Sequence, residues 1–269
     1  MSKHMMGQTR GSFGDRLLKK LPILMAFLIP VLILLILYIG REIFPFGNNM
    51  YLRSDMYHQY APFMREFQRN LQQGGSLLYA WNIGLGTNFA STYAYYLASP
   101  ANWLVLLFPD TLIPEFMNLM LILKSGLMSA VFAWYLIRKF NRNDYIATVF
   151  GCFYAMSSYM AAFSWNVMWL DCLVLFPLIL MGLEALVRQG RYRMYLITLA
   201  VCVISNYYIS IMICIFLIFY FVYLLICEMK HTDFYEILHR CLMAFGNTDE
   251  IFALSSAYPG QTPPWYVYG

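Results

Sequence analysis

The chain has 269 residues, of which 61% are hydrophobic and 12% are charged, and its mean hydropathy is +0.56. A soluble domain of this size keeps about a quarter of its residues charged, so the composition excludes a soluble globular protein and predicts an all-α polytopic membrane protein. The net charge of +4 is small and dispersed, which argues against a nucleic-acid-binding surface.

Six apolar segments are predicted to cross the membrane, because each approaches the ~20 residues that a bilayer core requires. The first, Leu21 to Ile39, ends in Gly40-Arg41-Glu42 and lacks the small-residue cleavage site of a secretory signal peptide. The other five lie near residues 113–137, 145–163, 167–187, 193–207 and 209–227. We therefore expect a basic cytoplasmic N-terminus (1–20), a first transmembrane helix (21–40), an external loop (41–112), a bundle of about five transmembrane helices (113–228) and a cytoplasmic or irregular tail (229–269).

The distribution of Lys and Arg predicts the orientation, since cytoplasmic connections retain positive residues. With the N-terminus inside, thirteen Lys and Arg residues fall on the inner side and four fall outside, all four in the loop 41–112. We therefore expect a multi-pass protein of the bacterial cell membrane with a cytoplasmic N-terminus and an extracytoplasmic first loop.

The first half of this loop predicts an amphipathic helix on the outer membrane surface. Apolar residues recur at helical spacing opposite polar ones: Tyr57, Tyr60, Phe63, Phe67 and Leu71 against Arg65, Gln68, Arg69 and Gln72. Ser54 or Asp55 is expected to cap its start. Gly74-Gly75 is expected to end it, and Pro62 either kinks the helix or begins its second half.

The second half of the loop is rich in Gly, Asn, Ser and Tyr. The run from Trp103 to Phe108 is too short to cross and is expected to rest at the interface, with Pro109 and Pro114 bracketing the turn into the second span. Gly84-Leu85-Gly86 has no predicted strand before it, so we interpret it as a turn and not as a nucleotide-binding loop.

The six cysteines predict neither a disulfide framework nor a metal site. They lie in predicted spans or on the inner side, without C-x-x-C pairing and without His at ligand spacing: Cys152, Cys172, Cys202, Cys214, Cys227 and Cys241. Buried structural thiols are the expected state.

The segment from Ser54 to Tyr60 places a carboxylate, Asp55, just outside the first span, beside His58 and Gln59. Such a carboxylate could deprotonate a hydroxyl or hold a cation, so a divalent metal is compatible with it although no motif implies a cofactor. The alternative is that Asp55 only caps a helix and that His58 faces water.

Charged residues inside the spans are the second group of candidates, because a charge in the bilayer core costs several kcal/mol unless it meets a partner or water. Lys124 could meet a lipid phosphate or an intramembrane Asp, and Asp171, near the outer end of its span, could pair with it or line a cavity. Glu184 is expected to snorkel or to pair with Arg188 at i,i+4. Asn206 is expected to serve helix packing, with a ligand contact as the alternative.

Several of these segments together resemble the bacterial YfhO family, and more distantly the polytopic GT-C glycosyltransferases. They are Ser54-Asp55-Met56-Tyr57-His58-Gln59-Tyr60-Ala61-Pro62-Phe63, Trp81 to Gly86, Tyr95 to Pro100, Lys124 in the second span, and Ser164-Trp165-Asn166 to Asp171. The resemblance runs from about residue 20 to 230.

The resemblance implies transfer of a sugar from an undecaprenyl-phosphate carrier in the bilayer onto an extracytoplasmic envelope polymer such as lipoteichoic acid. By analogy, Asp55 is the general base of an inverting transfer, and His58 and Gln59 shape the acceptor side. Tyr60, Asn166 and Asp171 are expected to contribute to substrate binding. Lys124 or a loop Arg would neutralise the leaving phosphate.

Members of that family are longer, with more spans and an external C-terminal domain, so the chain is expected to be an N-terminal fragment. Two other classes stay open. A transporter or flippase-like protein would use Lys124 and Asp171 as a substrate or proton path, although we find no internal repeat. In a structural subunit, all of these residues would only pack.

Overall fold

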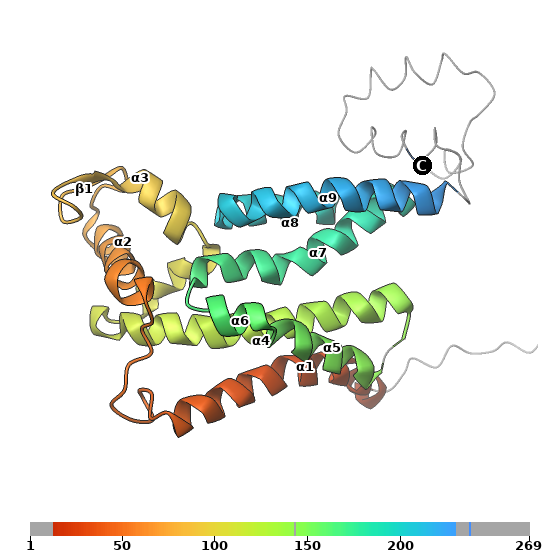
Figure 1. The fold of residues 1–269 in the computed structure, drawn as a ribbon, viewed down its shortest axis with the longest axis horizontal. Helices are drawn as coiled ribbons and strands as arrows, with labels where there is room; N and C mark the ends of the chain where they lie inside the picture. Colours follow the sequence, from red (N-terminus) through yellow and green to blue (C-terminus); the bar gives the residue numbers. More distant parts are fainter. Residues whose placement is uncertain (1–12, 143, 230–236, 238–269) are drawn as a thin grey trace, which may run out of the picture. The chain divides into compact units, whose positions relative to one another are not determined.

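The computed structural model describes residues 13–142, 144–229 and 237, with side chains described from Lys20 onward. Within this part, five helical segments are long and apolar enough to cross a membrane. They are α1 (Phe13–Gly40), α4 (Ile113–Phe140), α5 (Tyr145–Ala155) followed by α6 (Ser158–Phe163), α7 (Val167–Gln189) and α9 (Tyr207–Glu228). The all-α polytopic fold is thereby confirmed (Figure 1).

Two of the predicted spans differ in detail from the observed helices. The segment 145–163 is divided into α5 and α6 at Met156 and Ser157. The segment 193–207 forms α8 (Arg193–Ser205), whose 13 residues rise only about 20 Å at 1.5 Å per residue. The predicted tail 229–269 and Cys241 lie almost entirely outside the described residues.

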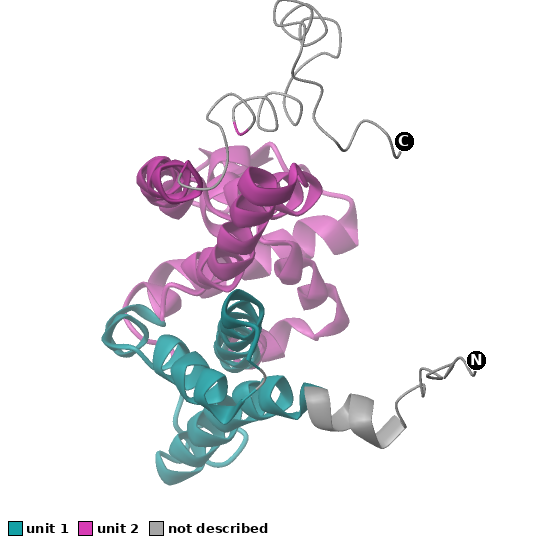
Figure 2. Ribbon diagram, turned by 90° about the vertical axis from the view of Figure 1, so that its right-hand side faces the viewer, with its two compact units in different colours: residues 1–51, 118–164 teal, residues 52–117, 165–269 magenta. Residues whose placement is uncertain are grey.

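The chain forms two compact units, which Figure 2 distinguishes by colour. Unit 1 comprises residues 1–51 and 118–164, and unit 2 comprises residues 52–117 and 165–269. Helix α4 begins in unit 2 and continues in unit 1.

Small residues allow the helices of unit 1 to approach closely, as in other membrane bundles. Ala26 of α1, Ala133 of α4 and Ala147 of α5 form one buried cluster. A Cβ atom on Gly151 would lie 2.5 Å from the carbonyl oxygen of Ser129. Thr148 donates its hydroxyl to the carbonyl of Pro22 at 2.8 Å, which links α5 to α1.

Unit 2 holds the first loop from Leu52 onward, together with α7, α8 and α9. The loop contains η1 (Met56–Tyr60), α2 (Ala61–Gln73), β1 (Tyr79–Ala80), β2 (Thr87–Asn88), α3 (Phe89–Thr92), η2 (Tyr93–Leu97), η3 (Pro100–Leu107) and η4 (Asp110–Leu112). The strands pair antiparallel, Tyr79 with Asn88 and Ala80 with Thr87. Gly84-Leu85-Gly86 is a turn, as predicted, but a short strand does precede it.

Pro62 and Gly74 take the places in helix α2 that the sequence predicts. Pro62 stands in its first turn and thus begins the second half of the helical segment, where its missing N–H costs nothing. Gly74 ends the helix in the left-handed region with φ of 67°, a conformation that other residues rarely adopt.

Residues of the loop itself cover both Phe67 and Gln68 of α2, while the position of this helix on the membrane stays a prediction. Phe67 is fully buried against Tyr93 and Trp103 of the same loop, with ring centroids 5.4 and 5.7 Å away. Gln68, expected on the exposed face, is buried and donates to the carbonyls of Val105 and Phe108 at 2.8 and 2.6 Å. The loop therefore has a small core of its own.

Polar contacts fix the two ends of the α7 to α9 bundle. Asn206 is fully buried; it accepts from the N–H of Ile209 as the cap of α9 and donates to the carbonyl of Tyr95 in the loop at 3.0 Å. Its predicted packing role is confirmed.

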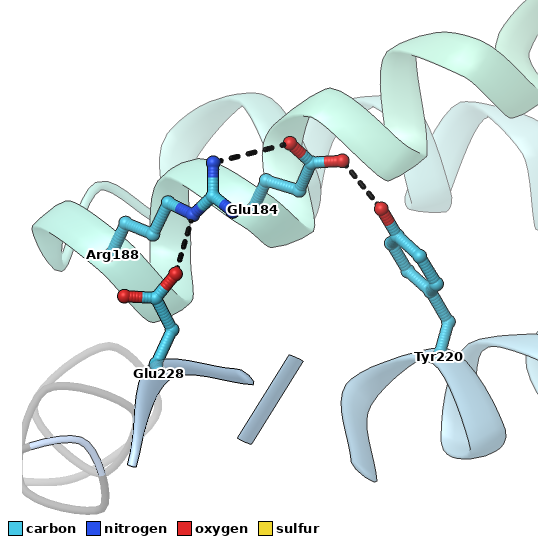
Figure 3. Close-up of polar contacts among 4 residues, drawn as sticks. All are labelled: Glu184, Arg188, Tyr220 and Glu228. Atoms are coloured by element: carbon cyan, nitrogen blue, oxygen red, sulfur yellow. Dashed lines mark hydrogen bonds and ion pairs between the residues drawn. The ribbon is translucent and has the colours of Figure 1, made fainter. Parts of the chain in front are cut away.

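At the other end, Glu184 accepts a hydrogen bond from Tyr220 and lies 3.8 Å from Arg188 at i,i+4, as predicted (Figure 3). Arg188 also contacts Glu228 at 2.8 Å. One guanidinium thus bridges carboxylates of α7 and α9, which compensates the burial of Glu184.

The described cysteines carry free thiols, of which Cys172 and Cys202 are buried and the other three half-buried. Ser210 of α9 donates its hydroxyl to Sγ of Cys202 at 3.2 Å, and the Sγ atom of Cys172 lies 3.8 Å from the same hydroxyl. These thiols therefore pack between α7, α8 and α9.

Candidate functional site in the first loop

Asp55 stands immediately before η1, but its side chain makes no capping hydrogen bond. The first N–H groups are satisfied by backbone instead: Met56 donates to the carbonyl of Arg53 at 3.0 Å and Tyr57 to that of Ser54 at 3.2 Å. The prediction that Asp55 caps this helix is therefore wrong. Its carboxylate is half-buried and makes no hydrogen bond to the start of the helix.

The short π-helix η1 turns Tyr60 toward the start of α7. The Tyr60 hydroxyl donates to Oδ1 of Asn166 at 2.8 Å, across 106 residues of sequence. Both side chains are buried, and Asn166 directly precedes the first residue of α7. Two predicted substrate-binding residues are thus brought together.

Aromatic rings surround this hydrogen bond. The ring of Tyr60 is nearly parallel to that of Trp165, with an interplanar angle of 11° and centroids 6.1 Å apart, and lies 5.4 Å from that of Tyr96 in η2. Tyr96 in turn contacts Phe63 of α2 at 5.0 Å and Tyr95 at 4.6 Å. We call Tyr60, Phe63, Tyr95, Tyr96 and Trp165 the aromatic cluster.

Gln59 and His58 differ in their surroundings although they are neighbours in sequence. Gln59 is half-buried and accepts a hydrogen bond from the Tyr96 hydroxyl at 3.3 Å. His58 is exposed, and its ring meets the edge of Tyr57 with centroids 5.1 Å apart. The exposure of His58 is compatible both with its predicted place on the acceptor side and with the alternative that it only faces water.

The carboxylate of Asp55 acts electrostatically on two phenols of the aromatic cluster. Burial raises the pKa of Tyr60 well above its usual range, and the charge of Asp55 adds to the rise. Burial also raises the pKa of Tyr96, with further contributions from Tyr95 and Asp55. Both hydroxyl groups therefore keep their protons at neutral pH and donate them to Asn166 and Gln59.

The charged residues of the spans belong to different units. Lys124 lies in the part of α4 that belongs to unit 1 and is only 3% exposed. Asp171 lies in the second turn of α7 in unit 2 and is half-buried. Their pairing, and a role of either in substrate binding, stay predictions.

A second polar group in the loop was not anticipated from the sequence. Glu66 of α2 is 7% exposed and pairs with Arg69 at 2.6 Å. With its amide oxygen turned toward Arg69, Asn82 accepts a hydrogen bond from Nη1 at 2.8 Å. The sequence could have pointed to this group, since Asn82 belongs to one of the segments that carry the family resemblance.

The acidic and thiol groups of the described residues do not gather into a metal site: no set of three or more His, Cys, Asp or Glu side chains is placed to hold an ion there.

Comparison with known proteins gives one match. The family described as bacterial membrane protein YfhO matches residues 25–252, most of the chain. No curated protein and no solved structure matches. The chain therefore belongs to the YfhO family of bacterial membrane proteins.

Proposed function

We propose that the protein is a glycosyltransferase that moves a sugar from a polyprenyl-phosphate carrier onto an extracytoplasmic envelope polymer such as lipoteichoic acid. The observation that supports this most is the state of Asp55, a loop carboxylate that caps no helix and whose charge reaches the phenols of Tyr60 and Tyr96. Membership in a family of bacterial membrane proteins is consistent with a lipid-linked donor.

In the proposed step, an acceptor hydroxyl attacks the anomeric carbon of the sugar while Asp55 takes its proton. The bond between the anomeric carbon and the phosphate oxygen breaks, and the polyprenyl phosphate leaves with the bonding electrons. Attack opposite the leaving group inverts the anomeric configuration. A positioned general base of this kind contributes about 10²–10⁴-fold to the rate.

The other candidates take supporting roles in this proposal. Gln59, held by Tyr96, and the exposed His58 form the acceptor side. Lys124 or an Arg of the loop neutralises the leaving phosphate, whose developing charge requires charge-assisted hydrogen bonds. Asp171 lies on α7, the helix that Asn166 precedes, and contributes polar lining.

The test is transfer of labelled sugar from undecaprenyl phosphate to a glycerol-phosphate polymer in membranes that contain the chain. We expect Asp55→Asn to lower the rate by about 10²–10⁴-fold, since it removes the base and keeps the size of the side chain. Asp110→Asn is the matched control, because Asp110 is an exposed carboxylate of the same loop, and should transfer at the wild-type rate. Membranes without the protein give the background.

Equal transfer by wild type and Asp55→Asn would contradict the proposed base. A transporter is the competing class, favoured by the burial of Lys124 inside a candidate span. It would instead lose substrate flux with Lys124→Gln and Asp171→Asn, and would tolerate Asp55→Asn.

A further inference from the structure

Within the described residues, the side-chain amide of Asn166 uses its acceptor but not its donor. Its side chain is 1% exposed, and Oδ1 accepts the hydrogen bond from Tyr60. Nδ2 meets no hydrogen-bond acceptor within the described part of the chain. The side chain does not cap α7 either, although Asn166 occupies the position before its first residue. Buried N–H groups are nearly always paired, so an unpaired one that lies among aromatic rings is a candidate donor to a ligand.

The surroundings of this amide have the composition of a sugar-binding site. Binding sites for small molecules combine aromatic walls with a few fixed polar groups. Here the rings of Tyr60, Trp165 and Tyr96 lie together around the Tyr60–Asn166 hydrogen bond. Aromatic faces pack against the C–H face of a pyranose ring, and an amide N–H can donate to one of its hydroxyls.

The negative charge of Asp55 should distinguish uncharged sugars from sugars that carry a carboxylate. Asp55, a half-buried carboxylate, stands immediately before η1, the helical turn that carries Tyr60. A second carboxylate on the ligand would be repelled by it, whereas an uncharged sugar would not.

We propose that Asn166 and the aromatic cluster form the subsite for the sugar, and that it takes an uncharged pyranose in preference to a uronic acid. The inference rests on the proposed transferase function. Nδ2 of Asn166 donates to a sugar hydroxyl, and the half-buried rings of Trp165 and Tyr96 support the sugar. The Tyr60 hydroxyl is a positioning group that keeps the amide in the orientation in which Nδ2 faces the ligand.

Binding can be measured without any transfer reaction. The full chain in lipid nanodiscs is titrated with octyl glucoside or octyl glucuronide below their micellar concentrations, and saturable quenching of tryptophan fluorescence reports binding. We expect the glucoside to bind at least tenfold more tightly than the glucuronide.

Substitutions then separate the parts of the subsite. Asn166→Asp still accepts the hydrogen bond from Tyr60 but loses the donor, and should weaken glucoside binding about tenfold, the factor that corresponds to one hydrogen bond. Tyr60→Phe keeps the ring and should weaken binding several-fold. Asn70→Asp is the control: among the described residues, Asn70 is also a buried amide whose Nδ2 has no hydrogen-bond partner. It lies beside Gly75 at the end of α2 and is not part of the aromatic cluster. This variant should bind like wild type.

Equal affinity for the two glycosides would overturn the inference. So would absence of saturable binding, or an Asn166→Asp variant that binds the glucoside as wild type does. These results are distinguishable from failure of the proposed function. A protein that transfers sugar with Asp55 but binds both glycosides equally refutes only the subsite. Selective glucoside binding without transfer refutes only the catalytic role.

Discussion

Gly182 of α7 lies so close to Tyr195 of α8 that a Cβ atom added to the glycine would stand 2.6 Å from the backbone nitrogen and 2.7 Å from the Cα of the tyrosine. The obstacle is backbone, which cannot rotate away. The missing side chain of Gly182 is therefore what allows the short helix α8 to pack against α7, as small residues do in other membrane bundles.

We expect Gly182→Ala to destabilise the protein by about 1–3 kcal/mol, the usual cost of overpacking. The measurement is thermal unfolding in detergent, followed by the loss of monodisperse protein. Gly40→Ala is the control, because a Cβ atom at Gly40 would meet nothing within 4 Å, and it should unfold like wild type. Equal stability of the two variants would show that α8 shifts freely on α7.

The hydroxyl of Tyr60 should contribute to the free energy of unfolding. This contribution should change with pH only under alkaline conditions. Burial and the charge of Asp55 raise its pKa from the ordinary 10.0. The folded protein therefore holds this proton more tightly than the unfolded chain. Its contribution is complete below the unfolded pKa and is lost as pH rises through the folded one.

We accordingly expect wild type to exceed Tyr60→Phe in unfolding free energy by about 1 kcal/mol, the net value of a typical hydrogen bond. The difference should stay constant at neutral pH and shrink above pH 10.0, the ordinary value. Chemical unfolding of both proteins over a pH series measures it. A difference that vanishes already near neutrality would mean that Tyr60 ionises there, contrary to its burial.

The membrane helices could be predicted because the apolar segments are long and uninterrupted, and their ends were close to those observed. The division between α5 and α6 could not, since Met156 and Ser157 lie within a run that is apolar enough to continue. Asn206 explains why α8 ends at Ser205. It lies between α8 and α9 in an extended conformation, and its side chain caps the start of α9.

The site was predictable in its residue types and not in its contacts. The sequence nominated Asp55, Tyr60 and Asn166, but the hydrogen bond between the last two spans 106 residues and depends on how the loop folds onto α7. Periodicity likewise placed Gln68 on the polar face of its helix. Its burial comes from residues 93–108 folding over α2, a tertiary effect that helical spacing does not contain.

Gln68 provides the last prediction, because its amide group holds the second half of the loop against α2. Nε2 donates to the carbonyls of both Val105 and Phe108. Gln68→Leu would leave the Phe108 carbonyl without this donor, whereas the Val105 carbonyl keeps the N–H of Phe108; an unpaired buried group costs about 1–3 kcal/mol. We expect the loop to open locally, with faster amide hydrogen exchange over residues 100–108 and little change in α7 and α9. Gln72→Leu is the control, since Gln72 of the same helix is exposed and should leave exchange unchanged. If Gln68→Leu exchanges at the wild-type rate, other contacts such as those of Phe67 with Tyr93 and Trp103 hold the loop, and the amide of Gln68 contributes nothing to its stability.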